Sequence, residues 1–201
     1  MNVAVLISGR GSNLEAILEK EKQKELGNAV ISLVVSNNPD AKGLEIAKRY
    51  GKKTIVLPSH RNQNRETYDK QLAETLEKND IDLVVLAGFM RILSPFFVNK
   101  FSNKIINIHP SLLPSFPGIN AQKQALDYGA KITGCTVHFV DEKVDHGPII
   151  LQEVVLVDDS DTEEILAKKI LEKEHILLPK AIRLFSEGKI IVEGRKVRIV
   201  N

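Results

Sequence analysis

The chain has 201 residues, of which 43% are hydrophobic and 27% charged, and its formal net charge at pH 7 is +2. This length supports one substantial hydrophobic core, and the small net charge, with Lys and Arg scattered along the chain, does not favour nucleic acid binding. The single cysteine excludes an internal disulfide and the strongest apolar run, 81–90, is too short to span a membrane, so together with an N-terminus that enters a strand directly we expect a cytoplasmic protein.

Apolar runs of strand length alternate with amphipathic helices through the first half of the chain. Strands are expected at 2–7, 30–36, 53–57, 81–88 and 104–108, and helices at 13–25, 41–50 and 65–79, with a short helix capped by Ser94. Nearly continuous apolar strands separated by helices indicate a parallel sheet that is covered on both faces. The last two of these strands are expected to be neighbours.

The second half of the chain has a different pattern of strands, which indicates antiparallel pairing. We expect a helix at 120–128, then strands at 132–140 and 149–157 that pair antiparallel across a turn-rich loop, a long helix at 162–187, and a hairpin at 189–200. The predicted fold is therefore α/β, with a doubly wound, mostly parallel, Rossmann-like sheet that continues into a mixed sheet. We expect one domain, 1–201, made of a phosphate-binding half (1–100) and a catalytic half (101–201).

The segment SGRGSN, residues 8–13, lies between the first strand and the first helix. Glycines let backbone amides approach an anion, and the positive end of the following helix favours one. A dinucleotide fingerprint would have a third glycine where Leu14 stands and an acid after the second strand, so NAD is not expected. Ser12 and Asn13 suit a terminal phosphate. The alternative left open is that Ser12 or Asn13 is only a helix cap.

The segment NIHPSLLPSFPG, residues 107–118, begins where the fifth strand ends. It places Asn107 and His109 at the start of a loop that contains three prolines, each of which fixes one backbone torsion. A stiff loop beside an amide and an imidazole indicates a prepared site. A polar strand end followed by a proline-rich surface loop is the alternative.

The segment DEKVDHGP, residues 141–148, supplies acids on a second loop. Loops at the carboxyl edge of a parallel sheet are where such folds place their chemistry, so Asp145 could approach Asn107 and His109. An ion pair there would favour the imidazolium form of His109. A solvated turn is the alternative.

The remaining histidines carry weaker signals. His138 is expected to pack or to support the site rather than to bind a ligand, and His60 and His175 are expected to take no part in catalysis. A metal site built from His109, His138, His146 and Asp145 is not expected, because the sequence has no H-x-x-x-H or H-E-x-x-H pair.

Five segments, GRGSN, LAGFMRILS, NIHPSLLPSFPG, GCTVHFV and DHGPIILQ, together resemble the phosphoribosylglycinamide formyltransferases, folate-dependent enzymes of purine synthesis. Their order and spacing agree over nearly the whole chain. The resemblance implies transfer of a formyl group from 10-formyltetrahydrofolate to the primary amine of phosphoribosylglycinamide, without a metal. Both partners would be small molecules, and the enzyme would be a monomer or a homodimer.

The resemblance also implies roles for individual residues. Asn107, His109 and Asp145 would be catalytic. The substrate would be bound by Gly11, Ser12, Asn13 and, at its ribose hydroxyls, Glu174. The folate would be bound by Arg65, Met90, Arg91, Ile92, Leu93, Asn107, Asp141 and Asp145, with the loop 141–145 closing over its pterin.

Three alternatives remain open from the sequence. One is another formyltetrahydrofolate-using enzyme, such as a deformylase. The second is metal-assisted hydrolysis that uses His109, His138 and Asp145. The third is a phosphoribosyl-ligand binding module without turnover.

Overall fold

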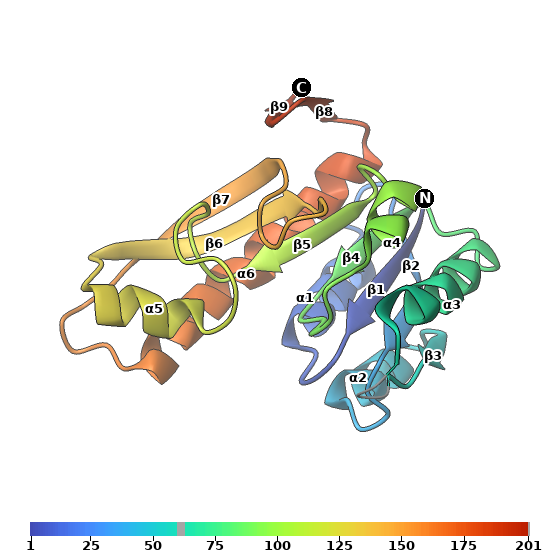
Figure 1. Ribbon diagram of the computed structural model, residues 1–201, viewed down its shortest axis with the longest axis horizontal. Helices are drawn as coiled ribbons and strands as arrows, with labels where there is room; N and C mark the ends of the chain where they lie inside the picture. The colour runs from blue at the N-terminus through green and yellow to red at the C-terminus, as the bar shows by residue number, and fades with distance from the viewer. Residues whose placement is uncertain (60–62, 201) are drawn as a thin grey trace.

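A seven-stranded sheet forms the centre of the structure, a computed structural model that describes residues 1–59 and 63–200 (Figure 1). Its order is β3-β2-β1-β4-β5-β6-β7, and β8 and β9 form a separate hairpin. The strands are β1 (Asn2–Ile7), β2 (Val30–Ser36), β3 (Thr54–Val56), β4 (Leu83–Leu86), β5 (Ile105–His109), β6 (Ile132–Phe139), β7 (Ile149–Leu156), β8 (Ile190–Glu193) and β9 (Lys196–Ile199). The helices are α1 (Ser12–Lys22), α2 (Lys42–Arg49), α3 (Arg65–Glu77), α4 (Pro95–Lys100), α5 (Ala121–Tyr128) and α6 (Glu163–Ser186).

The first five strands are parallel, whereas β6 and β7 are antiparallel to their neighbours. The predicted α/β class, the mixed second half and the pairing of β4 with β5 are therefore confirmed. The first helix ends at Lys22 rather than at 25, since Lys24 adopts a left-handed backbone with φ 61°. The third strand is likewise shorter than the expected 53–57.

Side chains alternate between two cores on opposite faces of the sheet. Val3, Val5 and Ile7 pack in one core with α1 and α6, whereas Ala4 and Leu6 pack in the other core with α3 and α4. In Figure 1, α3 and α4 lie in front of the sheet and α6 lies behind it. Burial of both faces explains the continuous apolar strands, because every residue of β1 after Asn2 is fully buried.

Two findings complete the fold. Within the described ranges, no helix has the length and apolar character needed to span a bilayer. His60, which the sequence predicts to take no part in catalysis, lies outside the described residues.

Candidate active site

The loop between β1 and α1 presents the amino end of a helix to a cavity. Gly11, with φ 80°, is the N-cap of α1, and no side chain caps this end. The interpretation of Ser12 or Asn13 as a mere cap is therefore wrong. A Cβ on Gly11 would lie 2.5 Å from the Cα of Gly43, so only glycine fits this turn. The amides of the first turn are thus left without a side-chain partner, as an anion site requires.

Polar side chains at the ends of β1 and β2 hold this loop in place. The Ser8 hydroxyl donates to Asn37 Oδ1 over 2.5 Å and accepts from the Met90 amide over 2.8 Å. The side-chain amide of Asn38 donates through Nδ2 to the backbone carbonyl of Ser8 over 3.2 Å. The two asparagines therefore position the loop, at the place where a dinucleotide-binding fold would put an acid for a ribose.

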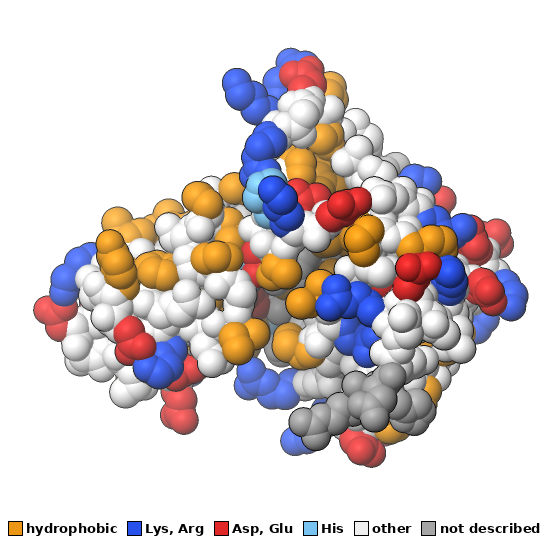
Figure 2. Space-filling model, in the orientation of Figure 1, with side chains coloured by type: hydrophobic (Ala, Val, Ile, Leu, Met, Phe, Trp, Pro, Cys, Tyr) orange, Lys and Arg blue, Asp and Glu red, His pale blue; other side chains and the backbone are white. Residues whose placement is uncertain are grey.

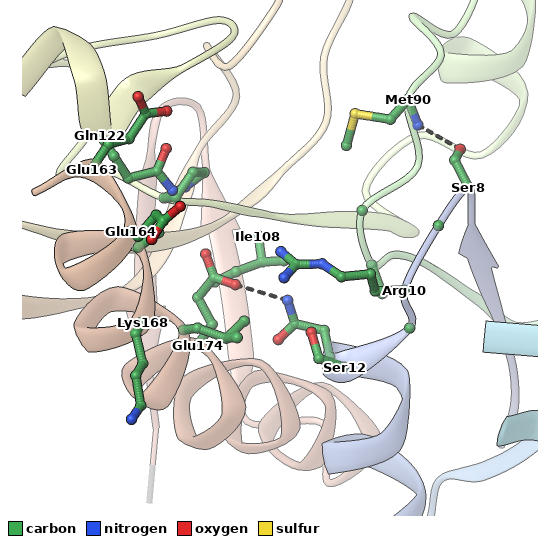
Figure 3. A pocket seen from close by; sticks show the side chains of 18 of the residues that line it. Ser8, Arg10, Ser12, Met90, Ile108, Gln122, Glu163, Glu164, Lys168 and Glu174 are labelled. Atoms are coloured by element: carbon green, nitrogen blue, oxygen red, sulfur yellow. Dashed lines mark hydrogen bonds between the residues drawn. The ribbon is translucent and has the colours of Figure 1, made fainter. Parts of the chain in front are cut away.

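A cavity of about 1310 Å³ opens beside the loop, between α1 and α6. Figure 3 shows the loop on one side and Glu163, Glu164, Lys168 and Glu174 of α6 on the other. The cavity is lined by Ser8, Gly9, Arg10, Gly11, Ser12, Asn13, Ala87, Gly88, Met90, Ile108, Pro110, Gln122, Thr162, Glu163, Glu164, Ala167, Lys168, Leu171 and Glu174. The three predicted phosphate residues and Glu174 thus share one cavity.

Arg10 is a cavity residue to which the sequence assigned no role. Its guanidinium extends into the cavity (Figure 3), and it forms no ion pair or hydrogen bond with other described residues. An unpaired cation beside free helix amides strengthens the attraction for an anion. The signal in the sequence was a cation inside a glycine-rich anion loop. Gln122 and Lys168 were also missed, because only the fold brings α5 and α6 to this cavity.

Glu174 connects the two walls of the cavity. Its Oε2 accepts a hydrogen bond from Asn13 Nδ2 over 2.8 Å, so α6 and α1 meet through these two side chains. Glu174 is 7% exposed. Burial raises the pKa of Glu174, and the bond from Asn13 opposes that rise. A desolvated carboxylate is a strong acceptor for ligand hydroxyl groups.

The raised pKa of Glu174 predicts a pH-dependent stability difference between the wild type and Glu174→Gln. The folded wild type holds this proton more tightly than the unfolded chain, so its free energy of unfolding falls as pH rises from the unfolded pKa of about 4.5 through the higher folded pKa. The glutamine variant lacks this loss and keeps an acceptor for Asn13. Its stability relative to the wild type should therefore rise across that interval and then level off.

Urea denaturation of both proteins at a series of pH values measures this difference. All other titrating groups are common to both proteins and cancel to first order. A difference that stays constant or falls with rising pH would contradict the buried, proton-retaining state of Glu174.

The end of β5 places the amide and the imidazole on one face of the sheet. Residues two apart on a strand share a face, so Asn107 and His109 project together, opposite Ile108, which lines the cavity. In the antiparallel pairing of β5 with β6, Asn107 lies opposite His138 and His109 lies opposite Thr136. This register assembles four polar side chains on one patch of sheet.

His138 orients the amide of Asn107. Its Nδ1 donates to the carbonyl of Phe139 over 2.7 Å, and its Nε2 is 3.2 Å from Asn107 Nδ2. The ring is 2% exposed, and burial lowers the pKa of His138. A neutral ring with its proton on Nδ1 accepts from Asn107 at Nε2. His138 thus supports the site from within the sheet, in agreement with the expectation that it packs.

His109 and Asp145 face each other across the two loops. His109 Nδ1 lies 3.4 Å from Asp145 Oδ2, and its Nε2 is 2.9 Å from the carbonyl of Phe116. Both neighbours are acceptors, which an imidazolium satisfies with its two N–H groups. Asp145 Oδ2 also accepts from the Gly118 amide over 2.8 Å. The structure therefore brings Asn107, His109 and Asp145 together, as the sequence led us to expect.

Thr136 anchors the proline-rich loop. Its buried hydroxyl donates to the carbonyl of Ser111 over 2.6 Å and accepts from the Leu113 amide and from Gln152 Nε2, each over 3.0 Å. Gln152 also donates to the carbonyl of Leu113 over 2.9 Å. The prolines are thus one part of the loop's rigidity, and these bonds to β6 and β7 are the other.

Five of the residues assigned to the folate follow β3 or β4 in the chain. Met90 and Ile92 are exposed, and Arg65 is exposed at the start of α3. The Arg91 guanidinium lies 4.0 Å from the centroid of the Tyr68 ring. Figure 2 shows hydrophobic side chains around a hollow on this face.

Two of the folate residues have side chains engaged elsewhere. Leu93 is 6% exposed and packs in the α3–α4 core, so only its backbone can meet a ligand. Asp141 Oδ2 lies 2.6 Å from His146 Nδ1. The cavity described above is lined by Met90 but by none of the other predicted folate or catalytic residues, which lie across β5.

The proposed metal ligands have other partners. Both ring nitrogens of His109 and of His138 lie beside protein partners, and within 1–59 and 63–200 no three His, Cys, Asp or Glu side chains are grouped as a metal site requires. His175 lies on α6, with its Nε2 buried and without a hydrogen bond to the described residues.

Comparison with known proteins agrees with this geometry. Residues 1–182 match the family described as "Formyl transferase". The chain is 43% identical to phosphoribosylglycinamide formyltransferase of Escherichia coli (strain K12), across 94% of this chain and 89% of that protein. The crystal structure of glycinamide ribonucleotide transformylase 1 from Symbiobacterium toebii is 47% identical, with a TM-score of 0.97 over 100% of this chain and 94% of that one.

Longer relatives contain a similar segment. The human trifunctional purine biosynthetic protein adenosine-3 is 48% identical over 94% of this chain, which corresponds to 18% of that protein. The chain thus spans only a small part, 14–19%, of the trifunctional relatives. By its family match and by its identity to relatives of similar length, the chain belongs to the formyl transferase family and, within it, to the phosphoribosylglycinamide formyltransferases.

Proposed function

We propose that this protein transfers a formyl group from 10-formyltetrahydrofolate to the amine of phosphoribosylglycinamide, a step of purine synthesis. The observation that carries the proposal is the convergence of Asn107, His109 and Asp145 beside a cavity lined by the amino end of α1 and by Arg10. In this proposal the halves 1–100 and 101–201 act as one unit, since the cavity combines the loop before α1 with α6.

The acceptor amine needs no activating nucleophile. An α-amino group with a pKa of about 8 keeps an appreciable neutral fraction near physiological pH, and this neutral form can attack the formyl carbon directly. The attack forms a C–N bond and turns the formyl oxygen into an oxyanion. Catalysis then requires donors at this oxygen and a route for one proton.

His109 and Asn107 supply the donors. The 3.4 Å separation between His109 Nδ1 and Asp145 Oδ2 is longer than a strong hydrogen bond, so this N–H retains donor capacity for a ligand oxygen placed beside Asp145. Phe116 holds the opposite edge of the ring. The Asn107 amide uses one N–H for His138 and keeps the other for the oxyanion.

Asp145 transfers the proton from the attacking amine to the departing folate nitrogen. The attacking nitrogen must lose a proton and N10 of the folate must gain one as its C–N bond breaks. Asp145, held by the Gly118 amide, stands beside His109 and can pass this proton through a water. The products are the formylated acceptor and tetrahydrofolate, with no net proton released.

The cavity accounts for the acceptor. Its phosphate meets the amides of Ser12 and Asn13 and the cation of Arg10, while its ribose hydroxyls reach Glu174. The folate occupies the opposite face of β5, along residues 90–93, with Arg65 near its glutamate carboxylates.

A direct assay tests the proposal against its alternatives. Purified protein is mixed with 10-formyltetrahydrofolate, with or without phosphoribosylglycinamide, while the absorbance of the folate product and the release of formate are followed. The expected result is a folate signal that requires the amine, without free formate, and that persists after incubation with a chelator. Formate release without the amine would indicate a deformylase, and loss of activity with chelator would indicate a metal-dependent hydrolase. Binding of both ligands without turnover would indicate a binding module.

A further inference from the structure

The loop 141–147, which carries Asp145, connects β6 to β7 and is fixed closely at its ends. The Phe139 amide donates to the carbonyl of Pro148 over 2.9 Å. A Cβ on Gly147 would lie 1.9 Å from the carbonyl oxygen of Phe139, so the backbone returns to β6 without room for a side chain. Asp145 itself has φ 50°, a left-handed conformation that the surrounding structure must hold.

The C-terminal hairpin contacts this loop through one residue. Arg195 lies in the turn between β8 and β9, and its Nη2 donates to the backbone carbonyl of His146 over 2.8 Å. Its Nη1 lies 3.2 Å from each ring nitrogen of His146. In Figure 1 the hairpin stands above the loop that joins β6 to β7.

His146 passes the contact on to the first residue of the loop. Its Nδ1 lies 2.6 Å from Asp141 Oδ2, so the imidazole connects the guanidinium of Arg195 to the carboxylate at the start of the loop. Asp141 Oδ1 accepts from the Lys143 amide over 3.0 Å. Asp141 and His146 lie on either side of Asp145 in the sequence, and Arg195 holds His146 from the hairpin.

The hairpin is well placed to act as a support. Ile190, Val192 and Val197 are partly buried against the core that contains α1 and α6. The turn at Gly194, with φ 61°, projects Arg195 from this packed base. A guanidinium can hold a carbonyl and an imidazole at once because its N–H groups diverge in one rigid plane.

We propose that Arg195 is a positioning residue that holds the loop 141–147 and, through it, places Asp145 against His109. This inference rests on the proposed function. The alternative is a surface contact without consequence, since exposed ionic contacts contribute little to stability. The two differ in their effect on turnover, because a catalytic group displaced by a fraction of an ångström loses rate even when the fold is unaffected.

The test compares Arg195→Ala, Arg195→Lys and a control, Arg198→Ala. Arg198 lies on the same hairpin and pairs with Glu193, and it has no contact with the loop among the described residues. Arg195→Ala should lower kcat by about tenfold and leave the KM for the acceptor unchanged. Arg195→Lys keeps one donor for the His146 carbonyl and should recover part of the rate. The control should match the wild type.

Amide hydrogen exchange supplies a readout that does not depend on turnover. Peptides that cover 141–147 should exchange faster in Arg195→Ala than in the wild type or in Arg198→Ala. Unchanged exchange in Arg195→Ala would overturn the inference whether or not the enzyme is active. So would faster exchange with a wild-type kcat. Absence of turnover in the wild type would instead count against the proposed function.

Discussion

Replacement of His109 by alanine is expected to lower kcat by about 100- to 1000-fold, as removal of a donor from an oxyanion site does in other enzymes. The proposed mechanism places the Nδ1–H of His109 on the formyl oxygen, where charge develops only during the reaction. The KM for the phosphoribosyl acceptor should therefore change little, since the acceptor is bound in the cavity beyond β5, which His109 does not line.

Steady-state kinetics with each substrate varied in turn measure both parameters. His109→Gln is the companion variant, because its amide can donate to the Phe116 carbonyl or to the formyl oxygen but cannot carry a positive charge. It should fold as the wild type does and remain slow. A kcat near the wild-type value in either variant would remove His109 from the mechanism, whereas a rise confined to the acceptor KM would assign it to binding.

Replacement of Thr136 by valine is expected to lower the free energy of unfolding by about 3 kcal/mol, because it leaves a buried amide and a buried carbonyl of the proline-rich loop without partners. Valine has nearly the shape of threonine, so the loss isolates the hydroxyl from the packing. The kcat should fall as well, since the loop carries the carbonyl of Phe116 and the amide of Gly118 that hold His109 and Asp145.

Urea denaturation and steady-state kinetics report the two effects. Thr136→Ser is the matched control, since it keeps the hydroxyl and loses only the methyl group, and it should retain the rate. If Thr136→Val matched Thr136→Ser in both stability and rate, the anchoring role of the hydroxyl would be wrong.

The fold could be predicted from the sequence because each of its determinants is local. Val3, Val5 and Ile7 alternate with Ala4 and Leu6 without a polar position, and this pattern already indicates a strand covered on both faces. The convergence of Asp145 with Asn107 and His109 was also predictable. The expectation rested on loops meeting at the carboxyl edge of a parallel sheet, but the loop 141–148 leaves β6 beside Ile106, near the amino end of β5, so the residues converge by a different route from the one expected.

Other features depend on distances that no local pattern sets. The bond between Asn107 and His138 requires the register of β5 against β6, and a shift by one residue would move His138 to the opposite face. The sequence shows that Arg10 is positively charged, but it does not show that the side chain extends into the cavity (Figure 3). The contact of Arg195 with His146 joins residues 49 apart in the sequence and depends on where the hairpin docks.

The residues on the two faces of β5 have a consequence for how the two ligands bind. Ile108 faces the cavity proposed for the acceptor while Asn107 and His109 face the other way, so in the proposed mechanism the two ligands meet at one strand end from opposite faces of the sheet. The proposed mechanism therefore lets each ligand bind while the other is present. In that mechanism the one-carbon unit passes from the folate to the acceptor at the end of β5, where the two ligands touch.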